Sequence, residues 1–212
     1  MEEVFWIDGE DGPSHVIRVD EAGAMTPDLV RAILEIDLQT FAENTFTSYT
    51  AAVFLQHGRV FLLRADDVVI GTCVLMRTWE DPDEATVLAM GIRPGWRGRG
   101  LGQRFVAGVL QRLLRSGVRR VTLMVASDNR RALRVYRDVG FSQVAEREAD
   151  PRTHDTLIVL RADLASLDSR VPSSIPAGNG EPRTVDIGKG PGARPSVTPS
   201  PVTRQAPLRT SE

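Results

Sequence analysis

Between residues 15 and 164, segments in which apolar residues alternate as in a β-strand are interspersed with segments in which they have helical spacing. Alternating or continuously apolar runs bounded by turn residues predict seven strands, at residues 15–19, 60–65, 68–76, 85–92, 118–126, 141–148 and 156–164. Helical spacing predicts four helices, at residues 27–37, 48–56 and 100–115 and from the cap residues 127–129 through 138. The order strand, helix, strand over residues 85–126 predicts a right-handed crossover, and therefore an α/β fold.

Composition divides the chain into three parts. Residues 1–13 are rich in glycine and acidic residues, and we expect a loose N-terminus there. Residues 14–168 carry all the predicted strands and helices and are expected to form one domain. Residues 172–212 are dominated by Pro, Ser, Gly, Thr and Arg and contain no aromatic residue, so we expect a disordered tail. A tail that binds a partner is an alternative that the sequence leaves open.

Charge and cysteine content exclude several classes of protein. The net charge of −2 gives no support for binding to nucleic acid or to an anionic membrane surface. No apolar stretch approaches the length of a membrane span, and Glu2 and Glu3 stand where a signal peptide needs basic residues, so we expect a cytoplasmic protein. Cys73 is the only cysteine, which excludes a multi-cysteine zinc site; we expect no metal, and a buried thiol without a chemical role.

A glycine-dense loop at residues 97–102 carries the strongest chemical signal. The sequence Arg-Gly-Arg-Gly-Leu-Gly joins a predicted strand to a predicted helix, where backbone N–H groups and the helix dipole favour a bound anion. A nucleotide-binding P-loop would need lysine after its last glycine, but Gln103 follows Gly102. A dinucleotide fingerprint would need glycine at position 103 or 105, where none stands. The pattern Gln/Arg-x-x-Gly-x-Gly/Ala does fit, with Arg97, Gly100 and Gly102.

The loop belongs to the longer motif Gly-Ile-Arg-Pro-Gly-Trp-Arg-Gly-Arg-Gly-Leu-Gly at residues 91–102. A second motif, Asn-Arg-Arg-Ala-Leu-Arg-Val-Tyr-Arg-Asp-Val-Gly-Phe, follows at residues 129–141. Together they resemble the GNAT family of N-acetyltransferases, most strongly over residues 85–144. The resemblance implies the GNAT acyl-CoA N-acyltransferase fold, an α/β (α+β) arrangement of flanking helices and a mixed sheet of six to seven strands, splayed between the fourth and fifth.

The resemblance implies acetyl-CoA as the co-substrate. In such proteins the loop amides hold the pyrophosphate, and the pantetheine arm runs like an extra strand along the splayed fourth strand. Arg97 completes the loop motif, and Asn129 would bond the pantetheine arm near the thiol. The implied cofactor-binding residues are Met90, Gly91, Ile92, Arg97, Gly98, Arg99, Gly100, Leu101, Gly102, Gln103 and Asn129. Gly91 is expected to allow a close approach.

Direct transfer requires a neutral amine that attacks and an acid that protonates the departing thiolate. The resemblance assigns the acid to Tyr136. Alternation of β residues places Glu84 on one strand face with Met90. Because some members of the family carry a glutamate on that strand face, the resemblance makes Glu84 a candidate base acting through water. A solvated acidic loop at residues 80–84 is the competing interpretation. His154 is a further candidate base, with a simply exposed side chain as the alternative.

The acceptor is expected to be a primary amine, either of a small molecule or of a protein N-terminus. The second half of the chain is similar to the ribosomal-protein alanine acetyltransferases, but Met124 stands where those enzymes carry a glutamate. Weak evidence for a base leans towards an amine of low pKa, such as an α-amine. Asp37, Glu43 and Asn44 could make an acidic acceptor pocket. A non-catalytic acyl-CoA sensor is the alternative function, and a homodimer is one option for the assembly.

Overall fold

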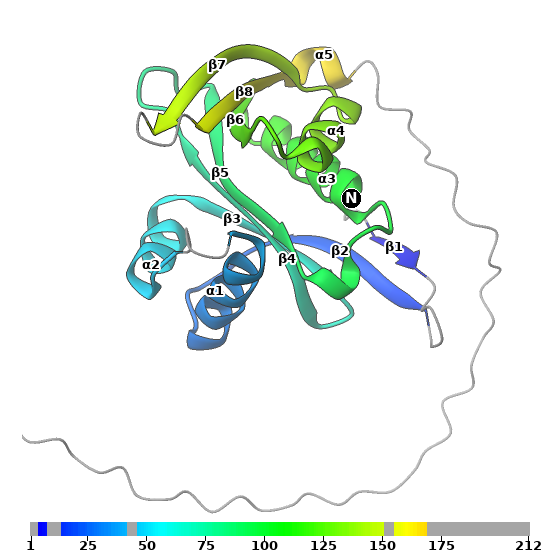
Figure 1. Ribbon diagram of the computed structural model, residues 1–212. Helices are drawn as coiled ribbons and strands as arrows, with labels where there is room; N and C mark the ends of the chain where they lie inside the picture. The colour runs from blue at the N-terminus through cyan, green and yellow to red at the C-terminus, as the bar shows by residue number, and fades with distance from the viewer. Residues whose placement is uncertain (1–3, 8–13, 42–45, 151–154, 169–212) are drawn as a thin grey trace, which may run out of the picture. The chain divides into compact units, whose positions relative to one another are not determined.

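The computed structural model describes residues 4–7, 14–41, 46–150 and 155–168. The chain divides into two units, Met1–Ile175 and Pro176–Glu212, and all described residues belong to the first. This unit is built on one eight-stranded sheet in the order β1-β2-β3-β4-β5-β6-β8-β7 (Figure 1). The strands are β1 (Val4–Ile7), β2 (His15–Glu21), β3 (Arg59–Ala65), β4 (Val68–Arg77), β5 (Glu84–Ile92), β6 (Arg120–Ala126), β7 (Ser142–Asp150) and β8 (Asp155–Asp163).

Helices cover both faces of the sheet. They are α1 (Pro27–Phe41), α2 (Ser48–His57), α3 (Leu101–Arg115), α4 (Arg130–Asp138) and α5 (Leu164–Asp168), with a 3-10 turn, η1, at Pro94–Trp96. Figure 1 shows α1 and α2 on one face and α3 and α4 on the other. Two apolar cores result, one under α1 and α2 and a larger one under α3 and α4. None of the described helices is both long and apolar enough to cross a bilayer.

The N-terminal edge corrects the expectation of a wholly loose segment before residue 14. Val4–Ile7 forms β1, which pairs antiparallel with β2. Phe5 and Ile7 pack against the larger core, so their burial offsets the cost of ordering this edge strand. The sheet therefore has eight strands rather than six to seven.

The first helix also differs from its predicted end. α1 starts at Pro27 as predicted, and the Thr26 hydroxyl accepts a hydrogen bond from the Leu29 N–H at 3.2 Å. It continues one turn past Asp37, the predicted last residue, to Phe41. The extra turn places Thr40 against Gly91 on β5.

Strands β5 and β6 diverge along their length. Among the strands that the structure describes they form the only parallel pair, and the pairing runs from Glu84 opposite Arg120 to Val87 opposite Leu123. Beyond Val87 and Leu123 the two strands continue without pairing to each other. This is the predicted splay between the fourth and fifth predicted strands, and it leaves polar backbone groups on the inner edges of both.

A β-bulge in β5 exchanges the two faces of that strand. Leu88 is an extra residue in the register with β4. Before the bulge, Ala85 packs into the core under α3; after it, Ala89 packs under α1 and α2, while Met90 packs on the α3 side. Glu84 neighbours Ala85 and so faces the α1 side. The expectation that Glu84 and Met90 share a face is therefore wrong, because simple alternation does not survive the bulge.

Candidate active site

The glycine loop connects the end of β5 to the start of α3. Gly98 and Gly100 have φ values of 86° and 73°, a left-handed conformation that side chains with a Cβ rarely adopt. A Cβ at either residue would meet no atom within 4 Å, so the backbone conformation, rather than crowding, calls for glycine. Leu101 follows as the first residue of α3 and is buried, which anchors the loop to the core.

Arg97, predicted to complete this loop, has turned its guanidinium back onto the fold. Its Nε donates to the Ile92 carbonyl at 2.7 Å, and its Nη2 donates to the Gln39 carbonyl at 3.2 Å and lies 3.4 Å from the Thr40 hydroxyl. The side chain therefore fastens the end of β5 to the last turn of α1. Its contribution to an anion site is to hold the loop in place.

The start of α3 is tied to α4. The Gln103 Nε2 donates to the Asp138 Oδ2 at 2.7 Å. A Cβ at Gly102 would lie 3.7 Å from both methyl groups of Val135, which is ordinary contact. The first turn of α3, with its free N-terminal amide groups, is thereby held beside α4.

Two arginines in and beside the loop lie over aromatic rings. The Arg99 guanidinium lies over the Trp96 ring, 5.6 Å from its centroid, and Arg104 lies over Phe5 at 4.5 Å. These contacts place one positive charge within the loop, at Arg99, and one on the first turn of α3, at Arg104.

The inner edge of β5 presents backbone groups at the splay. The Arg93 N–H donates to the Ile70 carbonyl on β4 at 2.8 Å. Because N–H and C=O groups alternate in direction along a strand, those of Met90 and Ile92 point away from β4, towards the splay. Of these groups, the Ile92 carbonyl already accepts from Arg97.

The close packing of α1 against β5 requires a glycine at position 91. A Cβ there would overlap the Thr40 hydroxyl and lie 3.0 Å from the Ile36 Cγ2, both on α1. The close approach that the sequence suggested at Gly91 is thus the approach of α1 to β5.

Tyr136 reaches from α4 to β5. Its hydroxyl donates to the Met90 sulfur at 3.7 Å, a weak acceptor, and its ring meets Phe141 edge-on with centroids 5.4 Å apart. Burial, together with the neighbouring Cys73, raises the pKa of Tyr136 above its usual value. The hydroxyl is therefore a proton-carrying donor at neutral pH. Cys73 is buried as predicted, and burial raises the pKa of its thiol to about 12.

Asn129 caps α4 beside the splay. Its Oδ1 accepts from the Ala132 N–H at 3.1 Å, and the residue is exposed. The cap uses the oxygen, and the amide nitrogen retains two N–H donors.

Glu84 is not brought together with Tyr136. It lies at the paired end of β5, where its carboxylate accepts from the Thr122 hydroxyl at 3.2 Å and faces Arg120 at 3.8 Å. Tyr136 contacts β5 six residues further along and on the other face. The carboxylate is thus part of a polar cluster at the closed end of the splay.

The other residues considered for the binding site of the acceptor amine lie in different environments. Asp37 is only 4% exposed, and its Oδ2 accepts from the Phe46 N–H at 2.6 Å. Burial raises the pKa of Asp37, although this hydrogen bond opposes the change. Met124 is exposed on β6, in the unpaired part of the splay. Three residues, Glu43, Asn44 and His154, lie outside the described residues.

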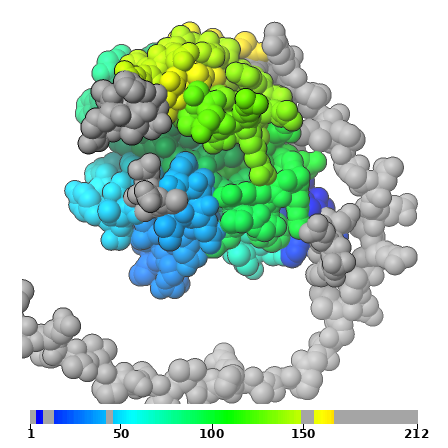
Figure 2. All heavy atoms as spheres, viewed as in Figure 1, coloured from blue at the N-terminus to red at the C-terminus, as the bar shows by residue number. Residues whose placement is uncertain are grey.

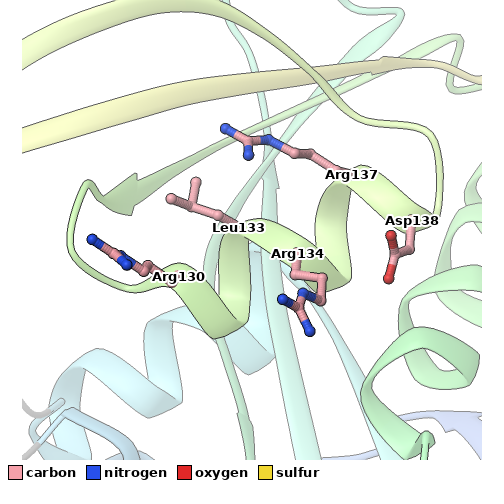
Figure 3. Close-up of a pocket in the computed structure, with 5 residues that line it drawn as sticks. All are labelled: Arg130, Leu133, Arg134, Arg137 and Asp138. Carbon is pink, nitrogen blue, oxygen red and sulfur yellow. The ribbon is translucent and has the colours of Figure 1, made fainter.

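A group of arginines on α4 was not singled out from the sequence. Arg130, Arg134 and Arg137 line a cavity of about 370 Å³ together with Leu133 and Asp138 (Figure 3). Their spacing of four and three residues, which puts them on one side of a helix, was an available signal. Within the described residues, no three His, Cys, Asp or Glu side chains gather as a metal site would require.

Comparison with known proteins identifies the family. The sequence profile of the acetyltransferase (GNAT) family matches residues 27–141, from the start of α1 to the end of the second motif. The N-alpha-acetyltransferase RimI of Mycobacterium tuberculosis is 30% identical over 129 residues, which cover 59% of this chain and 80% of that enzyme. The chain belongs to the GNAT family and is an N-acetyltransferase of that family.

Two further similarities are more limited in scope. The mycothiol acetyltransferase of Corynebacterium efficiens is 31% identical over 104 residues, but the match spans only 34% of that enzyme. The [ribosomal protein bS18]-alanine N-acetyltransferase of Escherichia coli K12 is 26% identical over 109 residues, 51% of this chain and 66% of that one.

Solved structures share the fold at low sequence identity. The ribosomal-protein-S18-alanine N-acetyltransferase from Escherichia coli has a TM-score of 0.59 and 21% identity, and the similarity covers 69% of this chain and 94% of that one. A Bacillus subtilis acetyltransferase in complex with CoA has a TM-score of 0.57 and 17% identity, covering 69% and 98%.

Proposed function

We propose that this protein transfers the acetyl group of acetyl-CoA directly to a primary amine bound in the same complex. One observation carries the proposal: the Tyr136 hydroxyl is aimed at Met90 on the open edge of β5, and that strand leads directly into the glycine loop. The candidate acid for the leaving thiolate therefore lies beside β5, and the candidate binding site for the phosphates of the donor follows β5 in the chain. The CoA-bound Bacillus structure, which shares the fold, supports the choice of donor.

The donor is held mainly by backbone groups. The amides from Gly98 to Gln103, together with the N-terminus of α3, hold the pyrophosphate. The pantetheine arm lies in the splay and pairs with the Met90 backbone and the Ile92 N–H. The Ile92 carbonyl takes no part, because Arg97 occupies it. The Asn129 amide nitrogen donates to the arm near the thioester.

The chemical step exchanges one bond for another. The lone pair of the amine attacks the thioester carbonyl carbon, a C–N bond forms, and the C–S bond breaks. Tyr136 donates its proton to the departing sulfur, so free CoA leaves as the thiol. The extra proton on the new amide nitrogen passes to water, and water returns a proton to Tyr136. A phenol is protonated at neutral pH, and its transfer of a proton to the sulfur depends on the position of the hydroxyl beside the leaving group.

The acceptor is proposed to be an amine of low pKa, such as the α-amine of a peptide. An α-amine has a pKa of about 7.7–8.0 and is partly neutral without help, whereas a lysine side chain at about 10.4 is not. Met124 offers no base in the splay, and Glu84 is engaged elsewhere. The relative named N-alpha-acetyltransferase RimI supports the same class.

The acceptor has an approach from the α1 side. Figure 2 shows a recess between the blue surface of α1 and the yellow-green surface of α4, with green atoms on its floor.

The proposed use of acetyl-CoA supports a cytoplasmic location for the protein.

Measurement of products over a panel of amines tests the proposal. The panel contains peptides with a free α-amine, the same peptides with that amine blocked and an internal lysine free, and small polyamines. We expect CoA thiol to appear in equal amount to a product heavier by one acetyl group, with free-α-amine peptides the best acceptors. Acetyl-CoA binding without product on any amine would instead support the sensor function.

A further inference from the structure

Two exposed apolar side chains at the start of the splay have no part in the transfer proposed above. Leu88 on β5 and Met124 on β6 are the first residues past the paired section of the two strands, which ends at Val87 opposite Leu123. Their exposed fractions are 43% and 54%, although both residues lie within strands in the interior of the sheet. Apolar side chains left open beside a reaction centre are typical of a ligand-binding surface.

Both side chains lie on the α1 side of the sheet. Val87 packs against the core under α3, and Leu88, the next residue, alternates to the opposite face. On β6 the neighbours Leu123 and Val125 are buried in the same core, so Met124 also faces the α1 side. The two strands therefore present adjacent apolar residues on the face from which the acceptor is proposed to approach.

This surface has an apolar part and a polar part. Val159 on β8 lies opposite Met124, and directly opposed residues of antiparallel strands share a face, so Val159 extends the apolar part. Towards the closed end of the splay, the Thr86 and Thr122 hydroxyls lie 3.0 Å apart, and the Glu84 carboxylate accepts from Thr122 at 3.2 Å. Because these polar groups already bond to one another, the apolar part is the portion of the surface that is open to a ligand.

The apolar part adjoins the reacting atoms. Leu88 precedes Met90 by two residues, about 7 Å along a strand, and the Met90 sulfur accepts from the Tyr136 hydroxyl. Tyr136 packs on the α3 side, whereas Leu88 and Met124 face the α1 side. A thioester bound in the splay therefore has its acid on one side and the apolar residues on the other. An amine that attacks from the α1 side carries its nearest substituent across those residues.

We propose that Leu88 and Met124 make the enzyme selective for peptides whose first side chain is apolar. The inference rests on the proposed α-amine acceptor and specifies the kind of residue that bears the amine. An apolar side chain would remove both exposed residues from water, which is favourable in proportion to the area buried. A polar side chain of similar size would lose hydrogen bonds to water there without replacing them.

The test compares two peptides that differ only in their first residue, leucine or asparagine, whose side chains are similar in size and uncharged. Release of CoA thiol gives kcat/KM for each peptide with the wild type, Met124→Gln, Leu88→Asn and Met25→Gln. Met25 is the matched control, because it is 56% exposed but precedes α1, at the end of that helix away from Thr40.

We expect the wild type to favour the leucine peptide at least about tenfold in kcat/KM. Met124→Gln and Leu88→Asn should each lower this ratio to below about threefold by raising KM for the leucine peptide. Met25→Gln should leave the ratio unchanged.

Two results overturn the inference: a wild type without preference for the leucine peptide, or Met124→Gln and Leu88→Asn variants that keep the wild-type ratio. A variant that slows both peptides by the same factor belongs to the second case, as a purely structural role would produce. In both cases the α-amine is still acetylated. A wild type that acetylates neither peptide contradicts the proposed acceptor instead, so the two failures are distinguishable.

Discussion

Gly91 on β5 and Thr40 on α1 are so close that a Cβ on Gly91 would overlap the Thr40 hydroxyl. That hydroxyl donates to the Ile36 carbonyl at 2.7 Å and also lies 3.4 Å from the Arg97 Nη2. The contact therefore joins three parts of the site: the open strand, the helix on the acceptor side, and the arginine that braces the glycine loop. The position of the glycine loop therefore depends on the close packing of α1 against Gly91.

Substitution Gly91→Ala should destabilise the fold. The added methyl group would meet the Thr40 hydroxyl and the Ile36 Cγ2, and overpacking of this kind typically costs about 1–3 kcal/mol. Urea denaturation measures the loss in the free energy of unfolding. Gly102→Ala is the matched control: a Cβ there makes only ordinary contact with Val135, and alanine in a helix gains about 0.5–1 kcal/mol over glycine. Equal stability changes in both variants would contradict this role for Gly91.

Substitution Gly100→Ala should weaken acetyl-CoA binding. The residue has a φ of 73°, and a left-handed conformation costs a residue with a Cβ about 1–2 kcal/mol, so the binding conformation becomes less populated. We expect the dissociation constant to rise about fivefold or more. Gly95→Ala serves for comparison, because Gly95 has open space around it and no positive φ. Unchanged affinity in Gly100→Ala would show that the loop conformation does not matter for binding.

Asp37 should make stability depend on pH. Burial raises its pKa in the folded protein, against the Phe46 N–H, so the folded state holds this proton more tightly than the unfolded state does. The contribution to stability is then fully present below the unfolded pKa of about 3.9 and is lost as pH rises through the raised folded value. Asp37→Asn keeps an oxygen for the Phe46 N–H and cannot titrate.

Urea denaturation of the two proteins between pH 4 and pH 7 measures this effect. The difference in unfolding free energy, wild type minus Asp37→Asn, should fall as the pH rises. A difference that stays constant or grows over this range would mean that the pKa of Asp37 is not raised.

The glycine loop shows what sequence patterns can predict. Gly98 and Gly100 adopt the left-handed conformation that a tight strand-to-helix turn demands, and turn residues report such demands directly. The long amphipathic pattern of α3 followed from the period of its apolar residues, and the splay of β5 from β6 was implied by the family resemblance. These features depend on local chemistry or on the family resemblance.

The features that escaped prediction depend on contacts between distant residues. The bulge at Leu88 has no glycine to mark it, and it moved Glu84 to the face opposite Met90. Arg97 fits a loop motif, yet its guanidinium bonds to α1, about sixty residues earlier in the chain. Val4–Ile7 is too short a strand to stand out, and it forms because β2 offers an edge.

The central claim is that acetyl transfer takes place at the open edge of β5, with Tyr136 as the acid. Tyr136→Phe removes one hydroxyl whose described partner is the weak Met90 sulfur acceptor, so the fold and acetyl-CoA affinity should be preserved. The most direct measurement is kcat for amine-dependent release of CoA thiol, with the acetyl-CoA dissociation constant determined on the same samples. We predict that kcat falls about 100-fold or more in Tyr136→Phe while the dissociation constant changes less than about twofold. A variant that turns over at the wild-type rate would contradict the account.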